Sequence, residues 1–301
     1  MVGLVGPTAS GKSRLAMELA LEADVEIISC DSLAVYRGLD VGSAKPTLDD
    51  RARVTHHLID VAEPNESFSA ADYARLARAA VDLIQGRGRK PLVVGGTGLY
   101  LRAFLGGLFD GPSRDDDLRA RLEGLGRDKG IGHLHELLSR VDPLAAERIK
   151  PGDRVRIVRA LEVYFLTGDG ISRRQRDCAG VVSPIAARLI GLCPPRGLLR
   201  QAVELRTREM FRHGLVAELE ALLARGLDRT VRPLQAIGYK QALAVLDGRL
   251  TPSEAEAEVV RETMRLAKRQ MTWFRHQADV EWFEEPVAAA LALRSVLTSA
   301  S

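Results

Sequence analysis

Eight residues near the amino terminus carry the spacing Gly-x-x-x-x-Gly-Lys-Ser, which is typical of a phosphate-binding loop, or P-loop. The loop follows an apolar run at residues 2–5 and consists of Gly6, Pro7, Thr8, Ala9, Ser10, Gly11, Lys12 and Ser13. Its glycines let the backbone turn tightly, so that N–H groups at the start of the next helix face an oligophosphate. Lys12 is expected to reach the terminal phosphate oxygens, and the Ser13 hydroxyl is a candidate ligand for Mg²⁺.

Two further polar residues lie just beyond apolar runs that we predict to be strands. Asp31 follows residues 25–29, and Thr97 follows residues 92–94 and a pair of glycines. Because ligands bind at the carboxyl ends of parallel strands, both residues should lie beside the P-loop. Asp31 is then a candidate catalytic carboxylate, with a structural or metal-shell role as the alternative. Thr97 either contacts the ligand or caps the following helix.

Strands and helices alternate in the first part of the chain, which predicts an α/β fold: a P-loop NTPase-like parallel sheet flanked by helices. The middle of the chain shows only helical patterns and predicts an all-helical insertion domain. The expected division is a core domain of residues 1–112 and 183–285, an insertion of residues 113–182 and a peripheral tail of residues 286–301.

Composition narrows the class of protein. The chain has 301 residues, 46% hydrophobic and 28% charged, with a net charge of +3, which is ordinary for a globular protein. No apolar stretch has the length of a membrane span and no leader precedes the P-loop, so we expect a cytoplasmic protein without a membrane partner. Cys30, Cys178 and Cys193 are scattered, lack metal spacing and are expected to be reduced thiols.

The residues alone leave several P-loop chemistries open. A nucleotide hydrolase is expected to end a buried strand in a metal-binding aspartate, but the run at residues 92–94 ends in glycines. No Asn-Lys-x-Asp motif is present to read guanine, so a switch GTPase is not expected. A kinase for a nucleoside or small alcohol stays open, because such enzymes also place an aspartate after the second strand. A non-catalytic RNA-binding ATPase is a third alternative.

Several further motifs follow the P-loop in a fixed order. They are Asp31-Ser32 with Val35-Tyr36-Arg37-Gly38-Leu39-Asp40-Val41-Gly42-Ser43-Ala44-Lys45-Pro46, His56-His57-Leu58-Ile59-Asp60, Gly95-Gly96-Thr97-Gly98-Leu99-Tyr100, Arg159-Ala160-Leu161-Glu162-Val163, Gly238-Tyr239-Lys240 and Lys268-Arg269-Gln270-x-Thr272-Trp273-Phe274. In these motifs the chain resembles the bacterial tRNA dimethylallyltransferases, from about Val2 to Phe283. Independent motifs in one order are far more specific than a P-loop alone.

The resemblance implies an activity. It is the transfer of a dimethylallyl group from dimethylallyl diphosphate to N6 of adenosine-37, 3′ of the anticodon, in tRNAs that read codons beginning with U. The products are N6-isopentenyladenosine and diphosphate. The P-loop then holds the diphosphate leaving group, with Mg²⁺ as cofactor. The implied partners are the donor and the tRNA anticodon stem-loop, which the helical insertion clamps, and the chain is expected to be a monomer.

The resemblance also implies roles for single residues. The family's catalytic positions fall on Asp31, Thr97 and Arg206. Asp31 takes the proton from N6, and Arg206 pairs with the diphosphate, although without the resemblance Arg206 is more typical of a helix surface. The implied tRNA contacts are Asp31, Ser32, Leu33, Ala34, Thr97, Arg119, Val155, Arg156, Arg159, Gln235, Gly238, Tyr239 and Lys240. Three positions depart from the commoner family residues, namely Ala34, Ala202 and Arg208.

Overall fold

The structure is a computed structural model that describes residues 1–107, 111–112, 114–177 and 183–299. Cys178 lies outside these ranges. The chain divides into two compact units: Met1–Leu105 with Ile185–Ser301, and Gly106–Pro184. The insertion expected at residues 113–182 falls inside the second unit. No helix in the described ranges has an apolar stretch of the length that a bilayer requires.

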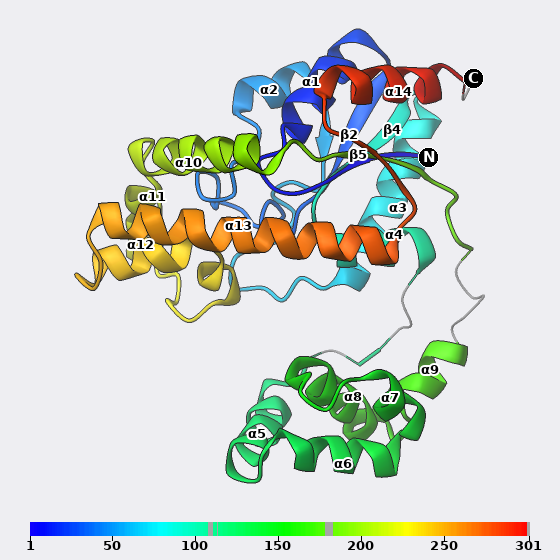
Figure 1. The fold of residues 1–301 in the computed structure, drawn as a ribbon, viewed down its shortest axis with the longest axis vertical. Coiled ribbons are helices and arrows are strands. Elements are labelled where there is room, and N and C mark those ends of the chain that lie inside the picture. Colours follow the sequence, from blue (N-terminus) through cyan, green and yellow to red (C-terminus); the bar gives the residue numbers. More distant parts are fainter. Residues whose placement is uncertain (108–110, 113, 178–182, 300–301) are drawn as a thin grey trace. The chain divides into compact units, whose positions relative to one another are not determined.

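The first unit is built on a parallel sheet of six strands in the order β3-β2-β4-β1-β5-β6 (Figure 1). The strands are β1 (Val2–Val5), β2 (Val25–Cys30), β3 (His56–His57), β4 (Lys90–Gly95), β5 (Arg188–Leu192) and β6 (Val280–Phe283). β1, β2 and β4 coincide with the apolar runs at residues 2–5, 25–29 and 92–94 that the sequence marks as strands. Because β2, β4 and β1 are neighbours, the residues that follow them meet at one edge of the sheet, and the predicted fold class is confirmed.

One face of the sheet is covered by α1 (Lys12–Glu22) and α14 (Pro286–Ser299). Leu19 of α1 and Leu293 of α14 belong to the same apolar core, together with side chains of four strands. The prediction of a peripheral tail at residues 286–301 is therefore wrong. The apolar side chains of α14 recur on one face of the helix, and burying them against β1 and β5 makes this segment part of the core.

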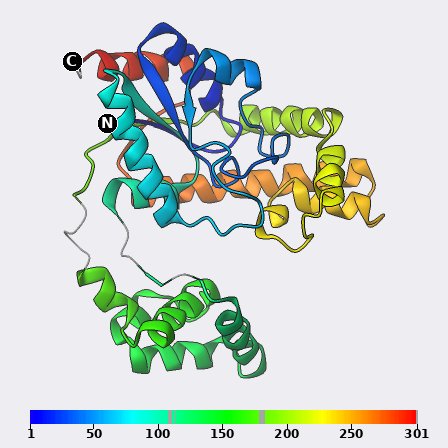
Figure 2. The same cartoon turned by 180° about the vertical axis from the view of Figure 1, so that it is seen from behind.

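The opposite face is covered by α3 (Ala70–Gly86), which is followed after β4 by α4 (Gly98–Gly106). α3 packs against β2 and β4, yet the core under α1 and α14 includes no described residue of α3, so the two groups of helices lie on different faces (Figure 2). Tyr73 of α3 stacks on Tyr100 of α4, with ring centroids 4.5 Å apart. This contact fixes α4, and with it the glycine loop that precedes α4.

The other helices of the first unit extend beyond the sheet. They are α2 (Leu48–Arg53), α10 (Arg196–Arg212), α11 (Leu215–Ala224), the 3₁₀ helix η1 (Arg232–Gln235), α12 (Tyr239–Leu246) and α13 (Pro252–Gln277). α13 packs along α10 and α12 (Figure 1). It begins at a capping box in which the Thr251 hydroxyl accepts the N–H of Glu254. Its last turns reach the P-loop, where Gln270 contacts Thr8.

The second unit is all helical over the residues that the structure describes. Its helices are α5 (Asp116–Asp128), α6 (Ile131–Val141), α7 (Pro143–Arg148), α8 (Arg154–Thr167) and α9 (Ile171–Asp177). Leu122, Leu134, Leu138 and Leu161 pack in a core of their own. The expected all-helical insertion is confirmed, because helix-period apolar stripes are buried against one another.

Candidate active site

The P-loop joins β1 to α1 through a tight turn. Gly6 has a φ of 144°, and a Cβ at this position would collide with the carbonyl oxygen of Leu192. Ala9 (φ 62°) and Gly11 (φ 93°) also adopt left-handed backbone, which turns the chain into α1. The first N–H groups of α1 have no acceptor within the helix, as an anion site requires. Within the loop itself, the Thr8 N–H already has an acceptor, because Oε1 of Gln270 accepts it at 2.9 Å.

Lys12 is buried and folds back over its own loop. Its ammonium donates to the carbonyl oxygen of Pro7 and, at 3.2 Å, to Oγ of Ser10. Burial and, to a smaller extent, the nearby positive charge of Arg206 lower the pKa of Lys12 to about 7, while the charge of Asp31 opposes the shift. The protein therefore holds this ammonium at an energetic disadvantage that a bound anion would remove.

Arg206 of α10 lies beside the same loop. Its guanidinium donates to Oγ1 of Thr8 at 3.3 Å and to the carbonyl oxygen of Ser43 at 3.2 Å. Burial lowers the pKa of Arg206, and the charge of Asp31 acts in the opposite direction. Arg206 and Lys12 are thus two neighbouring desolvated cations whose hydrogen-bond acceptors are neutral oxygens. Such a pair is a site for an anion with several charged oxygens.

Binding of dimethylallyl diphosphate, measured without tRNA, is expected to weaken as the pH rises above about 7, the pKa of Lys12. Below that pH Lys12 is already charged, and above it the bound diphosphate must draw a proton onto the amine. The affinity should fall by up to about tenfold per pH unit, since a terminal phosphate is already doubly ionised there. Calorimetry in two buffers of different ionisation enthalpy counts the proton taken up. An affinity that stays constant from pH 7 to 9 contradicts this expectation.

Asp31 follows β2 and is exposed at the edge of the sheet. Its Oδ1 accepts the backbone N–H groups of Leu33 and Ala34 at 2.8 and 3.3 Å. Within the described residues its other oxygen, Oδ2, accepts no hydrogen bond. The two alternatives for Asp31 are thus compatible: one oxygen holds the turn, and the other is available for chemistry.

Thr97 ties this turn to the loop after β4. Its Oγ1 accepts the N–H of Ser32 at 3.1 Å, and its own N–H donates to the carbonyl oxygen of Cys30 at 3.2 Å. Thr97 immediately precedes α4, and its side chain bonds to Ser32 rather than to the first turn of α4. Its position beside Asp31 agrees with the expected site, and its observed contact is a positioning one.

The residues expected to contact tRNA differ in their exposure. Those that are exposed include Ser32, Val155, Arg156 and Gln235. Leu33 is partly exposed and Gly238 is buried. Ala34 (5% exposed) and Tyr239 (0%) are buried as well, so the fold already packs both side chains, and the RNA contacts expected at these positions stay predictions.

Tyr239 holds a loop of the first unit. Its hydroxyl donates to Oε1 of Glu218 at 2.6 Å and accepts the N–H of Gly42 at 3.2 Å. Oε2 of Glu218 accepts the N–H groups of Asp40 and Val41 at 2.9 and 2.8 Å. A Cβ at Gly42 would collide with the tyrosine ring. α11 and α12 therefore hold the loop at residues 40–43, in which the carbonyl oxygen of Ser43 accepts a hydrogen bond from Arg206.

Arg119 and Arg159, two further expected tRNA contacts, pair with a buried carboxylate in the helical unit. Arg119 forms two hydrogen bonds of 2.8 Å with Glu162, and Arg159 forms one of 2.6 Å. Arg159 also donates to the carbonyl oxygen of Pro112, and Glu162 accepts the N–H of Asp115. Burial by itself would raise the pKa of Glu162, but the hydrogen bonds from both arginines lower it to about 2. Both arginines thus stabilise the fold of this unit.

Replacing Glu162 with glutamine is expected to destabilise the helical unit by about 3 kcal/mol, because two partly buried guanidiniums lose their counter-ion. Hydrogen exchange of the full chain, read by mass spectrometry, should then accelerate across α5 and α8 but not across α1. Glu136→Gln, the same change at an exposed position of α6, serves as the control and should leave exchange unchanged. Equal protection in Glu162→Gln and wild type would mean that the ion cluster does not stabilise the unit.

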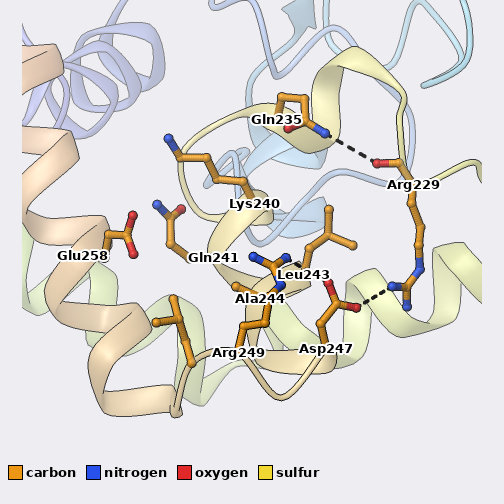
Figure 3. Close-up of a pocket in the computed structure, with 10 residues that line it drawn as sticks. Arg229, Gln235, Lys240, Gln241, Leu243, Ala244, Asp247, Arg249 and Glu258 are labelled. Carbon is orange, nitrogen blue, oxygen red and sulfur yellow. Dashed lines mark hydrogen bonds and ion pairs between the residues drawn. The ribbon is translucent and has the colours of Figure 1, made fainter.

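A hollow of about 510 Å³ lies between α12, α13 and the segment that carries η1 (Figure 3). It is lined in part by Lys240, an expected RNA contact. Its cations are paired: Arg229 and Arg249 with Asp247, and Lys240 with Glu262. The cations at this hollow are thus already paired with carboxylates, unlike Lys12 and Arg206 beside the P-loop.

The sequence did not assign a role to two residues that shape the site. Gln270 lies in a motif, but no local pattern shows that a helical glutamine meets a backbone group 262 positions away. Glu218 is one of several carboxylates near the start of α11 and has no distinguishing spacing. The sequence signal for both residues lies in the loops that Gln270 and Glu218 contact, which are rich in glycine and small residues.

The P-loop follows a central parallel strand, and a carboxylate and two desolvated cations lie beside it. This arrangement is typical of a P-loop protein that transfers a group from a phosphorylated donor. A family model described as IPP transferase matches residues 34–277. The chain belongs to the IPP transferase family.

Relatives of known sequence and structure agree with this assignment. The chain is 44% identical over 290 residues to tRNA dimethylallyltransferase 2 of Geotalea daltonii, covering 96% of this chain and 89% of that one. It is 44% identical over 286 residues to tRNA dimethylallyltransferase of Geobacter sulfurreducens, with 95% and 92% covered. The full-length tRNA isopentenylpyrophosphate transferase of Bacillus halodurans matches with a TM-score of 0.70 and 39% identity over 99% of this chain and 96% of that one. A eukaryotic dimethylallyltransferase acting on tRNA, 22% identical with a TM-score of 0.74 over 94% and 73%, shares the fold.

Proposed function

We propose that this chain transfers a dimethylallyl group from dimethylallyl diphosphate to N6 of an adenosine in tRNA and releases diphosphate. The observation that carries the proposal is the pair of desolvated cations, Lys12 and Arg206, beside the exposed carboxylate of Asp31. Family membership supports it. The finer proposal is that the acceptor is adenosine-37 in tRNAs that read codons beginning with U. No observation favours the kinase alternative.

The diphosphate is the part of the donor that the P-loop grips. Lys12 and Arg206 pair with its oxygens, and the N–H groups at the start of α1 add hydrogen bonds. When the bond between the allylic carbon and the diphosphate oxygen breaks, negative charge grows on that oxygen. The same cations and dipoles stabilise this charge more strongly than the ground state, which accelerates bond breaking.

The acceptor nitrogen forms the new bond to the allylic carbon. The exocyclic N6 of adenine is a poor nucleophile, because its lone pair is delocalised into the ring. Asp31 accepts a hydrogen bond from N6 through Oδ2 and takes its proton as the carbon–nitrogen bond forms. Thr97 contributes by holding the turn that carries Asp31. The proton from N6 is transferred to the carboxylate of Asp31, and the electron pair of the broken carbon–oxygen bond stays with the diphosphate.

The residues at the start of α1 are suited to binding Mg²⁺ together with a diphosphate. The Ser13 side chain is exposed in the first turn of α1, next to Lys12. In the part of the chain that the structure describes, no group of three or more histidine, cysteine or acidic side chains is arranged to hold a metal. Mg²⁺ often uses substrate phosphates, waters and few protein ligands, so we propose that Ser13 and the diphosphate hold it together. When bound, the ion neutralises charge on the leaving group.

The RNA must present its adenine outside the base stack, which costs a few kcal/mol. We propose that exposed residues of both units offset this by contacting the anticodon stem-loop. Arg156 of the helical unit, with 73% of its side chain exposed, forms only a surface ion pair with Asp153 at 3.5 Å that a phosphate can replace, and Gln235 offers a neutral donor and acceptor. These contacts make binding salt-dependent. We further propose that the protein acts as a monomer in the cytoplasm.

The direct test incubates the protein with radiolabelled dimethylallyl diphosphate, Mg²⁺ and unmodified tRNA. Label should enter the tRNA as N6-isopentenyladenosine and be lost when a chelator removes Mg²⁺. A transcript whose adenosine-37 is replaced by guanosine tests the finer assignment and should remain unlabelled. Rapid ATP turnover with no labelled RNA would overturn the proposal in favour of a kinase or ATPase.

A further inference from the structure

Gln270 of α13 connects two loops of the site that lie far apart in the sequence. Its Oε1 accepts the backbone N–H of Thr8 at 2.9 Å. Its Nε2 donates to the carbonyl oxygen of Gly96 at 3.1 Å. One side chain thus joins the P-loop after β1 to the glycine loop after β4.

The primary amide of Gln270 matches both partners. The N–H of Thr8 can only donate and the carbonyl of Gly96 can only accept, so the bridge must accept at one atom and donate at another. A carboxylate cannot donate, an ammonium cannot accept, and asparagine is shorter by one methylene. Gly96 permits the close approach, because a Cβ there would lie 2.5 Å from Nε2 of Gln270. One turn later on α13, Trp273 occupies the space that a Cβ of Gly98 would need.

Each of the two loops controls one side of the reaction. Oγ1 of Thr8 accepts from Arg206 at 3.3 Å, so the P-loop sets the position of a cation that faces the diphosphate. Oγ1 of Thr97 accepts the N–H of Ser32 at 3.1 Å, so the glycine loop sets the turn that carries Asp31. The distance between these loops therefore decides whether the carboxylate and the leaving group are aligned.

We propose that Gln270 is a positioning residue that holds the donor-binding P-loop and the acceptor-side glycine loop in register through Thr8 and Gly96. The inference rests on the proposed function, because it assigns the two loops to the two substrates. Gln270 acts on the reaction only through these backbone groups. Misalignment of reacting groups by about 1 Å can lower a rate by about 10²-fold, so a single bridge of this kind has a measurable effect.

Gln270→Met removes both hydrogen bonds and keeps the length of the side chain. It is expected to lower kcat/KM for dimethylallyl diphosphate by roughly 10- to 100-fold and to raise its KM. The dissociation constant of inorganic diphosphate should rise as well, whereas that of tRNA should stay within about twofold, because the bond from Thr8 to Gln270 holds the P-loop. Val259→Ala, which removes buried methyl groups from the same helix, is the stability control. It should lower the melting temperature without changing KM for the donor.

Gln270→Glu provides a second readout that loss of stability alone would not produce. When ionised, the new carboxylate accepts from Thr8 but cannot donate to Gly96. When protonated, it regains an O–H donor and reproduces the bridge. The ratio of its rate to that of wild type should therefore rise by about tenfold from pH 8 to pH 5.5, because the ratio cancels the pH effects that both proteins share. The same ratio for Gln270→Met should not change with pH.

Two results would overturn the inference. One is a folded Gln270→Met protein with wild-type kcat and donor KM. The other is a Gln270→Glu ratio that does not depend on pH. A wild-type protein that labels no tRNA would instead refute the proposed function, and the comparison of diphosphate binding between wild type and Gln270→Met would still decide whether Gln270 supports the P-loop.

Discussion

Replacing Lys12 with methionine is expected to lower kcat/KM for dimethylallyl transfer by about 10³-fold, because the charge that stabilises the departing diphosphate is removed. Methionine has nearly the length of lysine and no charge, so it fits the buried space that Lys12 occupies. Burial and, to a smaller extent, the charge of Arg206 lower the pKa of Lys12 to about 7, which shows that the folded protein disfavours its charge. Removing that charge should therefore leave the melting temperature unchanged or raise it. Reduced activity in a protein of full stability separates a catalytic role from a structural one.

Single-turnover labelling of tRNA at saturating donor gives the rate, and calorimetry with dimethylallyl diphosphate gives the affinity. Lys129→Met, the same change at an exposed position that ends α5, is the control and should retain wild-type kinetics. A folded Lys12→Met protein that keeps more than about a tenth of the wild-type kcat/KM would refute the proposed role of the P-loop lysine.

Asp31→Asn is expected to lower kcat by about 10²- to 10⁴-fold with little change in donor KM, the range that general bases contribute. The structure makes this substitution informative, since Oδ1 accepts the N–H groups of Leu33 and Ala34. The asparagine oxygen can still accept both bonds, so the turn persists and only the proton acceptor at Oδ2 disappears.

Asp31→Ala is the comparison variant, because it removes the turn's hydrogen bonds together with the base. It should lose activity to a similar extent and also lower the melting temperature, whereas Asp31→Asn should not. Rates are measured in single turnover, with tRNA affinity determined separately by filter binding. Near-normal kcat in Asp31→Asn would remove Asp31 from the chemistry and leave it only its structural role.

The sequence predicted those parts of the site whose groups are adjacent along the chain or lie at strand ends. The P-loop is one contiguous segment, so its phosphate-binding character depends on local spacing alone. Asp31 and Thr97 were predicted from their places after strands, because parallel order brings strand ends together. Arg206 required the family resemblance, since an arginine in the middle of a helix carries no local signal.

The residues expected to contact RNA show that exposure and pairing are tertiary properties. The family resemblance implies RNA contacts at Arg119 and Arg159, and in the fold Glu162 binds both. Tyr239 lies in a motif that suggested RNA contact, but its ring is buried against Gly42. A side chain is free to bind a partner only when the fold has not already used it.

The carboxyl-terminal segment shows the same limit. Its alternation of alanine and leucine was compatible with a loose tail, because a short apolar helix gains stability mainly from what it packs against. The core partners are strands β1 and β5, which begin 284 and 98 residues earlier in the chain than Pro286. No pattern within the segment could reveal them.

The sequence by itself determined the phosphate loop, the parallel α/β order, the helical insertion and the family, because each depends on spacing within a short segment or on the order of segments. Only the tertiary structure decided that Lys12 and Arg206 are neighbouring desolvated cations, that Asp31 keeps one oxygen free, and that Gln270 joins the two loops. These are relations between atoms far apart along the chain. They exist only after packing has excluded water and brought the strand ends together, and they set the charge and alignment on which the reaction depends.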